Sequence, residues 1–199
     1  KHMHVRKPYF TILLTLVLSN LGKAQVFQYE SVTDELLQNP PNEEWLSWRG
    51  TPRSWGYSPL NQINTENVDE LQLVWSWALD DTGSAQAAPL VHDGVMFIPA
   101  PRGVIQALDA TTGDLLWEYR PGVTPSMDGS NQEITAEELG DAAMPLTAFA
   151  GVGRGVQKNI AIYGDMVYAA TENASIRAVD ARTGLLVWES QTADPSLGY

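Results

Sequence analysis

The chain has 199 residues, of which 44% are hydrophobic and seven are tryptophan, so it can bury a core and is not a disordered chain. Four of its 12 basic residues precede residue 25, and the remainder carries eight basic and 24 acidic residues, a net charge of −16. This balance disfavours nucleic acid or an anionic membrane surface as a partner, because binding to phosphate needs clustered Lys and Arg. The sequence contains no cysteine, which excludes disulfides, thiolate zinc sites and a thiol nucleophile.

Residues 1–24 have the pattern of a secretory signal peptide. A basic stretch at residues 4–7 precedes an apolar run over residues 9–21, which is too short to cross a bilayer comfortably. Gly22 and Ala24 supply the small residues that a signal peptidase needs. The pattern predicts a cleaved signal, and an uncleaved anchor helix is the alternative.

Residues 25–72 form a segment with short helices and many tryptophans. The capping-box pattern at residues 31–34 predicts one short helix. A second short helix is expected over residues 64–71, with Val68 and Leu71 facing inward.

Strand-forming segments and tight turns dominate the rest of the chain. Residues 73–79, with Val74, Trp75 and Trp77, predict a first strand. Asp-Gly, Thr-Gly and Gly-Asp turns then separate eight short strands in two groups of four. The predicted strands are residues 88–92, 95–100, 104–109 and 115–119, followed by 160–163, 166–171, 175–180 and 185–189.

One pattern, A-x-D-A-x-T-G-x-x-x-W, occurs at residues 107–117 and again at residues 178–188, 71 positions later. Repeats at a long fixed period mark repeat architectures, and four antiparallel strands per repeat is the blade of a β-propeller. The motif predicts a Trp lying flat on the adjacent blade, with the small Ala leaving room under a neighbouring ring and the Gly permitting the tight turn. Its carboxylates, Asp109 and Asp180, are interpreted as structural turn residues. The alternative fold is a β-sandwich in which the two Thr-Gly turns resemble each other by chance.

The predicted fold is therefore all-β, a partial propeller over residues 73–199. Its blades lie at about residues 73–120 and 158–190. The long connection at residues 121–157 contains another capping box at residues 135–138, and loops of this length inside compact folds are usually functional.

The two motif copies resemble the tryptophan-docking motifs of pyrroloquinoline quinone (PQQ) dependent alcohol dehydrogenases. Residues 48–64 and 88–97 are similar to signatures of the same family. The resemblance implies an eight-bladed propeller that holds PQQ and Ca²⁺ at its axis. It also implies alcohol oxidation by hydride transfer to PQQ, with an Asp as base, Ca²⁺ as Lewis acid and a periplasmic cytochrome c as electron acceptor.

The resemblance implies two cofactor-binding residues in this segment. Arg154, set between glycines, matches the family Arg that pairs with a PQQ carboxylate, and its alternative role is that of a surface loop Arg. Gln86 stands where relatives commonly have a Glu, and it is otherwise a polar residue entering the first strand. The vicinal cysteine pair of the methanol-type enzymes is replaced near Ala148 and Phe149, which puts a methanol-type assignment in doubt.

No catalytic residue and no metal ligand is assigned in this segment. The resemblance places the family's catalytic Asp and its Ca²⁺ ligands beyond Tyr199, so the 199 residues alone are expected to be inactive. The competing hypothesis is a cofactor-free propeller that acts as a protein-interaction scaffold. Such scaffolds are usually lipoproteins, and the absence of a lipobox cysteine argues against that class. A membrane-bound glucose dehydrogenase is disfavoured, because it would show several N-terminal transmembrane helices.

Overall fold

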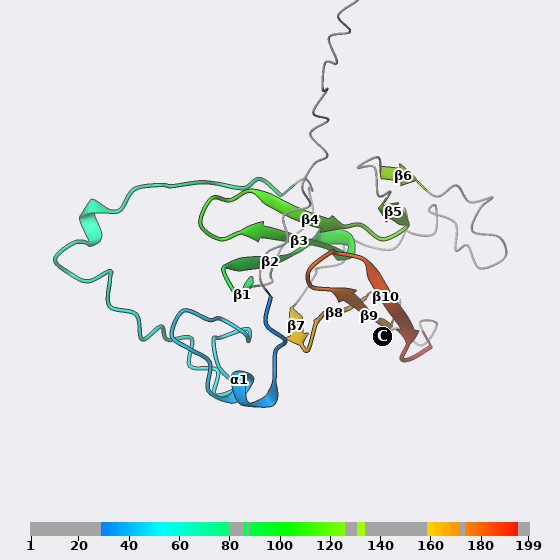
Figure 1. Cartoon of the computed structure of the whole chain (residues 1–199), viewed down its shortest axis with the longest axis horizontal. Helices are drawn as coiled ribbons and strands as arrows, with labels where there is room; N and C mark the ends of the chain where they lie inside the picture. Colours follow the sequence, from blue (N-terminus) through cyan, green and yellow to red (C-terminus); the bar gives the residue numbers. More distant parts are fainter. Residues whose placement is uncertain are drawn as a thin grey trace, which may run out of the picture.

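A computed structural model describes residues 29–79, 86, 88–125, 131–133, 159–171 and 174–194. Two four-stranded antiparallel sheets dominate it and lie next to each other, as Figure 1 shows. The predicted signal peptide lies outside the described residues. Within the described part of the chain, no helix is long and apolar enough to cross a membrane.

The first sheet has the strand order β1-β2-β3-β4 that the turn pattern predicts. Its strands are β1 (Leu90–His92), β2 (Val95–Ala100), β3 (Val104–Asp109) and β4 (Leu115–Tyr119). Asp93 and Gly94 join β1 to β2 with φ angles of 49° and 74°, the two positive values that a tight hairpin turn requires. A single 3-10 turn, η2 (Pro101–Gly103), joins β2 to β3.

The second sheet repeats this order about 71 residues later. Its strands are β7 (Ile160–Tyr163), β8 (Met166–Ala170), β9 (Ser175–Asp180) and β10 (Leu186–Gln191). The predicted bounds differ from these by at most two residues, which is the usual uncertainty of element ends. The edge strands β1 and β7 approach each other, as the inner strands of neighbouring propeller blades do.

One hydrophobic core joins the two sheets. Phe97, Ile105 and Trp117 of the first sheet belong to the same buried cluster as Ile162 and Val167 of the second. A single blade could not bury both of its faces, and here each sheet supplies one face to the other. The propeller-type arrangement predicted from the repeat is confirmed.

Residues 73–79 do not form the predicted strand, and this prediction is wrong for the described chain. Their backbone makes no strand pairing among the described residues. The segment is fastened by its side chains instead. The indole N–H of Trp75 donates to the Ala110 carbonyl at 3.2 Å, and that of Trp77 donates to Gln106 Oε1 at 3.0 Å.

The first short helix is present, although its capping differs from the prediction. Helix α1 (Asp34–Gln38) is capped by Thr33, whose Oγ1 accepts from the Leu36 N–H at 3.2 Å. Ser31, the first residue of the predicted capping box, donates its hydroxyl to Asp165 instead. A long-range partner has therefore replaced the local one.

The second predicted helix is reduced to a turn and the short 3-10 helix η1 (Val68–Glu70). Val68 and Leu71 are 51% and 58% exposed, so the prediction that they face inward is wrong for the described residues. The connection at residues 121–157 holds an unpredicted hairpin of β5 (Val123–Pro125) and β6 (Asn131–Glu133). The helix predicted at residues 135–138 lies outside the described part.

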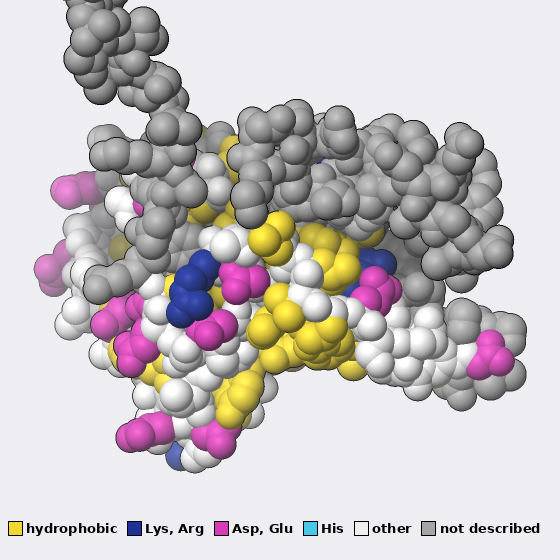
Figure 2. Space-filling view, turned by 45° about the vertical axis from the view of Figure 1, so that its right-hand side comes forward, with side chains coloured by type: hydrophobic (Ala, Val, Ile, Leu, Met, Phe, Trp, Pro, Cys, Tyr) yellow, Lys and Arg dark blue, Asp and Glu magenta, His cyan; other side chains and the backbone are white. Residues whose placement is uncertain are grey.

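Two regions leave large hydrophobic side chains on the surface. Residues 48–74 run as an extended arm away from the sheets in Figure 1, with Trp55 and Leu73 74% and 83% exposed. Strand β10 is exposed along its length and carries Trp188, which is 42% exposed. Figure 2 shows hydrophobic side chains gathered into a continuous patch on one face of the molecule.

Candidate functional site

The site that the sequence predicts lies where the chain enters the inner strands. Gln86 is exposed and stands four residues before Leu90, the first residue of β1. Arg154 stands six residues before Ile160, the first residue of β7, and lies outside the described residues. Ala148 and Phe149 lie outside them too. The assignment of Gln86 and Arg154 as cofactor-binding residues therefore stays a prediction.

A polar network lies between β3 and β4. Gln106 accepts from the Trp77 indole and donates to Glu118 Oε2 at 2.6 Å. Arg120 forms an ion pair with the same Glu118 carboxylate. Each of these polar side chains therefore has a partner, and the Arg120 guanidinium neutralises the partly buried Glu118 carboxylate.

The second sheet has its own version of this network at positions 71 residues later. Arg177 replaces Gln106, and its guanidinium pairs with Glu189 Oε2 at 2.8 Å. Ser175 donates to the other oxygen of that carboxylate at 2.6 Å. Sequence reasoning missed both networks, although a glutamate directly after each motif tryptophan was a readable signal.

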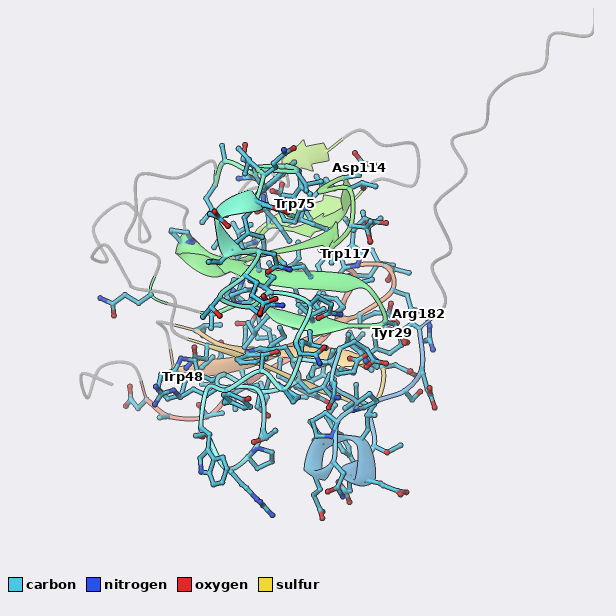
Figure 3. All side chains as sticks on the ribbon, turned by 90° about the vertical axis from the view of Figure 1, so that its left-hand side faces the viewer. Tyr29, Trp48, Trp75, Asp114, Trp117 and Arg182 are labelled. Atoms are coloured by element: carbon cyan, nitrogen blue, oxygen red, sulfur yellow. The ribbon has the colours of Figure 1, made fainter. Side chains whose placement is uncertain are left out.

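The opposite end of the sheets carries the repeated motif, where the tryptophan docks on the adjacent blade as predicted, although the residue beneath the ring is the glycine rather than the alanine. Trp117 packs on Gly184, where a Cβ atom would lie 2.6 Å from the ring, and its indole N–H donates to the Ala181 carbonyl at 3.0 Å. Trp75 does the same on the first sheet, over Gly113 and the Ala110 carbonyl. Figure 3 shows Trp75 and Trp117 at successive levels of the stacked sheets.

The motif carboxylates are turn residues, as interpreted. Asp180 Oδ1 accepts from the backbone N–H groups of Arg182 and Thr183 at 3.0 and 2.9 Å. Asp109 Oδ1 accepts from the equivalent Thr112 and Thr111 groups, and these hydrogen bonds hold the pKa of Asp109 below its ordinary value of 3.8. Both carboxylates therefore stabilise the turn on which the tryptophan docks.

Glu44, His92 and Asp93 form a cluster at this same end of the sheets. His92 is 1% exposed, with Nδ1 2.8 Å from Glu44 Oε2 and Nε2 2.7 Å from the Glu30 carbonyl oxygen. The two ring nitrogens face different acceptors on opposite sides of the ring. Donor atoms of the three residues lie within 4.8 Å of one another, but both ring nitrogens already face hydrogen-bond acceptors, so the geometry is that of a hydrogen-bonded pair.

Comparisons with known proteins identify relatives for nearly the whole chain. Residues 45–140 match the family model described as "Glucose/ethanol/alcohol dehydrogenase, beta-propeller domain", which is named for PQQ. The quinohemoprotein alcohol dehydrogenase ADH IIB of Pseudomonas putida is 32% identical over 195 residues, which cover 98% of this chain and 25% of that protein. The 1-butanol dehydrogenase (cytochrome c) of Thauera butanivorans is 36% identical over 149 residues, 75% of this chain and 19% of that protein.

The solved structures agree with the sequence comparison. The quinohemoprotein alcohol dehydrogenase of Comamonas testosteroni superposes with a TM-score of 0.62 and 29% identity, over 85% of this chain and 22% of that one. The chain therefore spans about a quarter of the length of the relatives it matches. The sequence match to ADH IIB, over 98% of the chain, includes both sheets, whereas the family-model match at residues 45–140 includes only the first.

Proposed function

We propose that the chain is a β-propeller segment of the PQQ-dependent alcohol dehydrogenase family, whose model matches residues 45–140, and that it forms the first blades of a quinoprotein that oxidises alcohols. The observation that supports this most directly is the docking of two motif blades with their inner strands β1 and β7 side by side. Further blades would complete the ring, since blades of this kind bury their faces only against neighbours.

The positions of the two candidate residues suit a cofactor on the propeller axis. Gln86 and Arg154 each precede an inner strand, β1 and β7 respectively. Equivalent strands of neighbouring blades begin at the same end of a propeller, so we expect both side chains at one rim near the axis. This rim lies at the other end of the strands from the turns on which the tryptophans dock.

The chemistry of these residues fits PQQ, a planar quinone that carries carboxylates. The Arg154 guanidinium would bind a carboxylate through two parallel hydrogen bonds, and the glycines beside it let the backbone approach closely. The Gln86 amide would donate to an oxygen of the cofactor and, unlike the Glu of relatives, would add no negative charge. When bound, PQQ supplies the two-electron acceptor for the alcohol.

The remaining parts of the site belong to the longer protein. We propose that the base and the ligands of a Ca²⁺ ion lie outside this chain, and that Ca²⁺ polarises the quinone carbonyl. Electrons would leave to a cytochrome c, the acceptor named for the Thauera butanivorans relative. The signal-like pattern of residues 1–24 supports export to the periplasm, where such an acceptor is found.

The test is PQQ binding by full-length protein freed of cofactor, measured by calorimetry with Ca²⁺ present. Replacing Arg154→Ala should raise the Kd for PQQ by a factor on the order of 10², since a charged bidentate contact contributes about 3 kcal/mol. Gln86→Ala should raise it less. Arg53→Ala, at an exposed position of the extended arm, is the matched control and should leave binding unchanged.

Two results would count against the proposal. Equal Kd values for the Arg154 and Arg53 variants would remove Arg154 from the site. Failure of the wild-type protein to bind PQQ would favour the cofactor-free scaffold, which is expected to bind no quinone in any variant.

A further inference from the structure

Residues 29–32, here called the N-terminal strap, connect the two blades at the rim opposite the proposed cofactor site. On the first blade, the Glu30 N–H donates to Asp93 Oδ2 at 2.6 Å, in the turn between β1 and β2. His92 Nε2 lies 2.7 Å from the Glu30 carbonyl oxygen. Both backbone groups of Glu30 are therefore engaged with adjacent residues of one hairpin.

The other half of the strap lies on the second blade. Val32 exchanges two backbone hydrogen bonds with Gly164, of 3.0 and 2.8 Å, in the turn between β7 and β8. Ser31 donates its hydroxyl to Asp165 Oδ1 at 2.5 Å. The strap thus bridges equivalent turns of two neighbouring blades, in addition to their shared core and the Trp117–Ala181 hydrogen bond.

His92 is the buried group at the first end of the strap. Its ring nitrogens face two acceptors, the Glu44 carboxylate and the Glu30 carbonyl. A neutral imidazole has one N–H and can donate to only one of them, whereas the imidazolium donates to both. The geometry therefore suits the protonated ring.

The charges around His92 favour its protonated form. Burial on its own would lower the pKa of His92, but the hydrogen bonds to Glu44 and to the Glu30 carbonyl, together with the Glu44 and Asp93 charges, outweigh it and raise the pKa above 6.5. Tyr29 packs edge-on against the ring, with the centroids 5.0 Å apart. Among the described residues, the cation nearest to this position is Arg182, which lies on Tyr29 and pairs with Asp165 at 3.1 Å.

We propose that His92 is a proton-operated latch, which as imidazolium holds the N-terminal strap across the two blades and loosens the Glu30 end of the strap when it loses its proton, leaving the Glu30 N–H bond to Asp93 at that end. The Glu44 carboxylate keeps the remaining N–H, because a charged acceptor binds it more strongly than a carbonyl. The Glu30 carbonyl then faces the lone pair of Nε2. The Ser31–Asp165 end contains no group that titrates near neutral pH and stays closed.

The direction of the pH effect follows from the raised pKa. A group whose folded pKa exceeds its unfolded value stabilises the folded state fully below the unfolded pKa, which is 6.5 for His. This stabilisation is lost as the pH rises through the folded pKa. The strap is therefore tight in mildly acidic solution and looser in alkaline solution.

The test is amide hydrogen exchange of residues 29–46 in the full-length protein between about pH 6 and pH 9, corrected for the intrinsic exchange rate at each pH. Protection of this segment should fall several-fold across the range in the wild type. In His92→Gln it should be lower at acidic pH and nearly constant. Ser31→Ala is the matched control, because it weakens the other end of the strap equally at every pH and keeps the wild-type slope.

Constant protection in the wild type, or the same slope in His92→Gln, would overturn the proposal. Nitrogen chemical shifts of the His92 ring in the wild type give a second measurement that needs no substitution. Both nitrogens should carry protons at about pH 6.5, and a neutral ring at that pH would equally overturn the latch. Neither measurement depends on PQQ or on alcohol oxidation, so the latch and the proposed function fail separately.

Discussion

Gly113 and Gly184 show why the repeated motif tolerates so little change at its centre. Both have φ angles near +75°, where a side chain is strained, and both lie under a tryptophan ring. The ring's N–H is bound to the carbonyl of an alanine in the same turn. Backbone conformation, ring packing and one hydrogen bond therefore all depend on the same residue.

We expect Gly184→Ala to destabilise the protein by about 3 kcal/mol. Roughly 1 kcal/mol comes from the positive φ, and about 2 kcal/mol from a Cβ that would lie 2.6 Å from the Trp117 ring. Gly94→Ala is the matched control, because Gly94 has the same φ within a degree but no atom within 4 Å. Thermal or urea unfolding measures the stability of both variants. Equal losses of stability would show that the Trp–Gly contact contributes nothing.

Residues whose role depends on a local pattern could be predicted, and those that depend on distant partners could not. The turn roles of Asp109 and Asp180 follow from neighbours two and three positions away. His92 and Ser31 act through partners 48 and 134 positions away along the chain, respectively. No periodicity of the sequence marks such contacts, since they exist only once the strap has folded onto the blades.

At the scale of elements, turns proved better predictors than strand composition. The eight predicted strands are all present, and the β1–β2 and β7–β8 hairpins close on two-residue turns that contain a glycine. Residues 73–79 have strand-forming composition but no neighbouring turn and no partner among the described residues. Their position depends on Trp75 and Trp77, which bind to the first sheet through their indole rings.

The Trp75 side chain should therefore hold this segment in place. Trp75→Ala is expected to cost about 2–3 kcal/mol of stability and to raise amide exchange in residues 71–79, since it removes a half-buried ring and a donor to Ala110. Ser76→Ala, at the exposed neighbouring position, should change stability by less than about 0.5 kcal/mol. Unchanged exchange in the Trp75 variant would mean that the backbone of the segment is held by other contacts.

At the scale of the whole molecule, the first blade covers one face of the second blade and leaves its other face uncovered. Trp188 occupies the motif position of Trp117, yet it is 42% exposed where Trp117 is 8% exposed. The relatives are about four times as long as the chain. We therefore expect a further blade of the full-length protein to cover this face.

This expectation can be tested by the cost of removing each tryptophan. In the full-length protein, Trp188→Ala should cost about 3–5 kcal/mol, as Trp117→Ala should, because each ring would then dock on a following blade. Unfolding measurements on the two variants give the comparison directly. A loss below about 1 kcal/mol for Trp188→Ala, beside a full loss for Trp117→Ala, would place Trp188 on an open surface.

The central claim is that these blades belong to a PQQ-dependent alcohol dehydrogenase. The most direct measurement is reduction of an artificial electron acceptor by the full-length protein with a primary alcohol, after PQQ has been removed and then added back with Ca²⁺. The account predicts no reduction without PQQ, restored reduction with it, and a rate that depends on the alcohol. Protein that retains its fold but neither binds PQQ nor reduces the acceptor would contradict it.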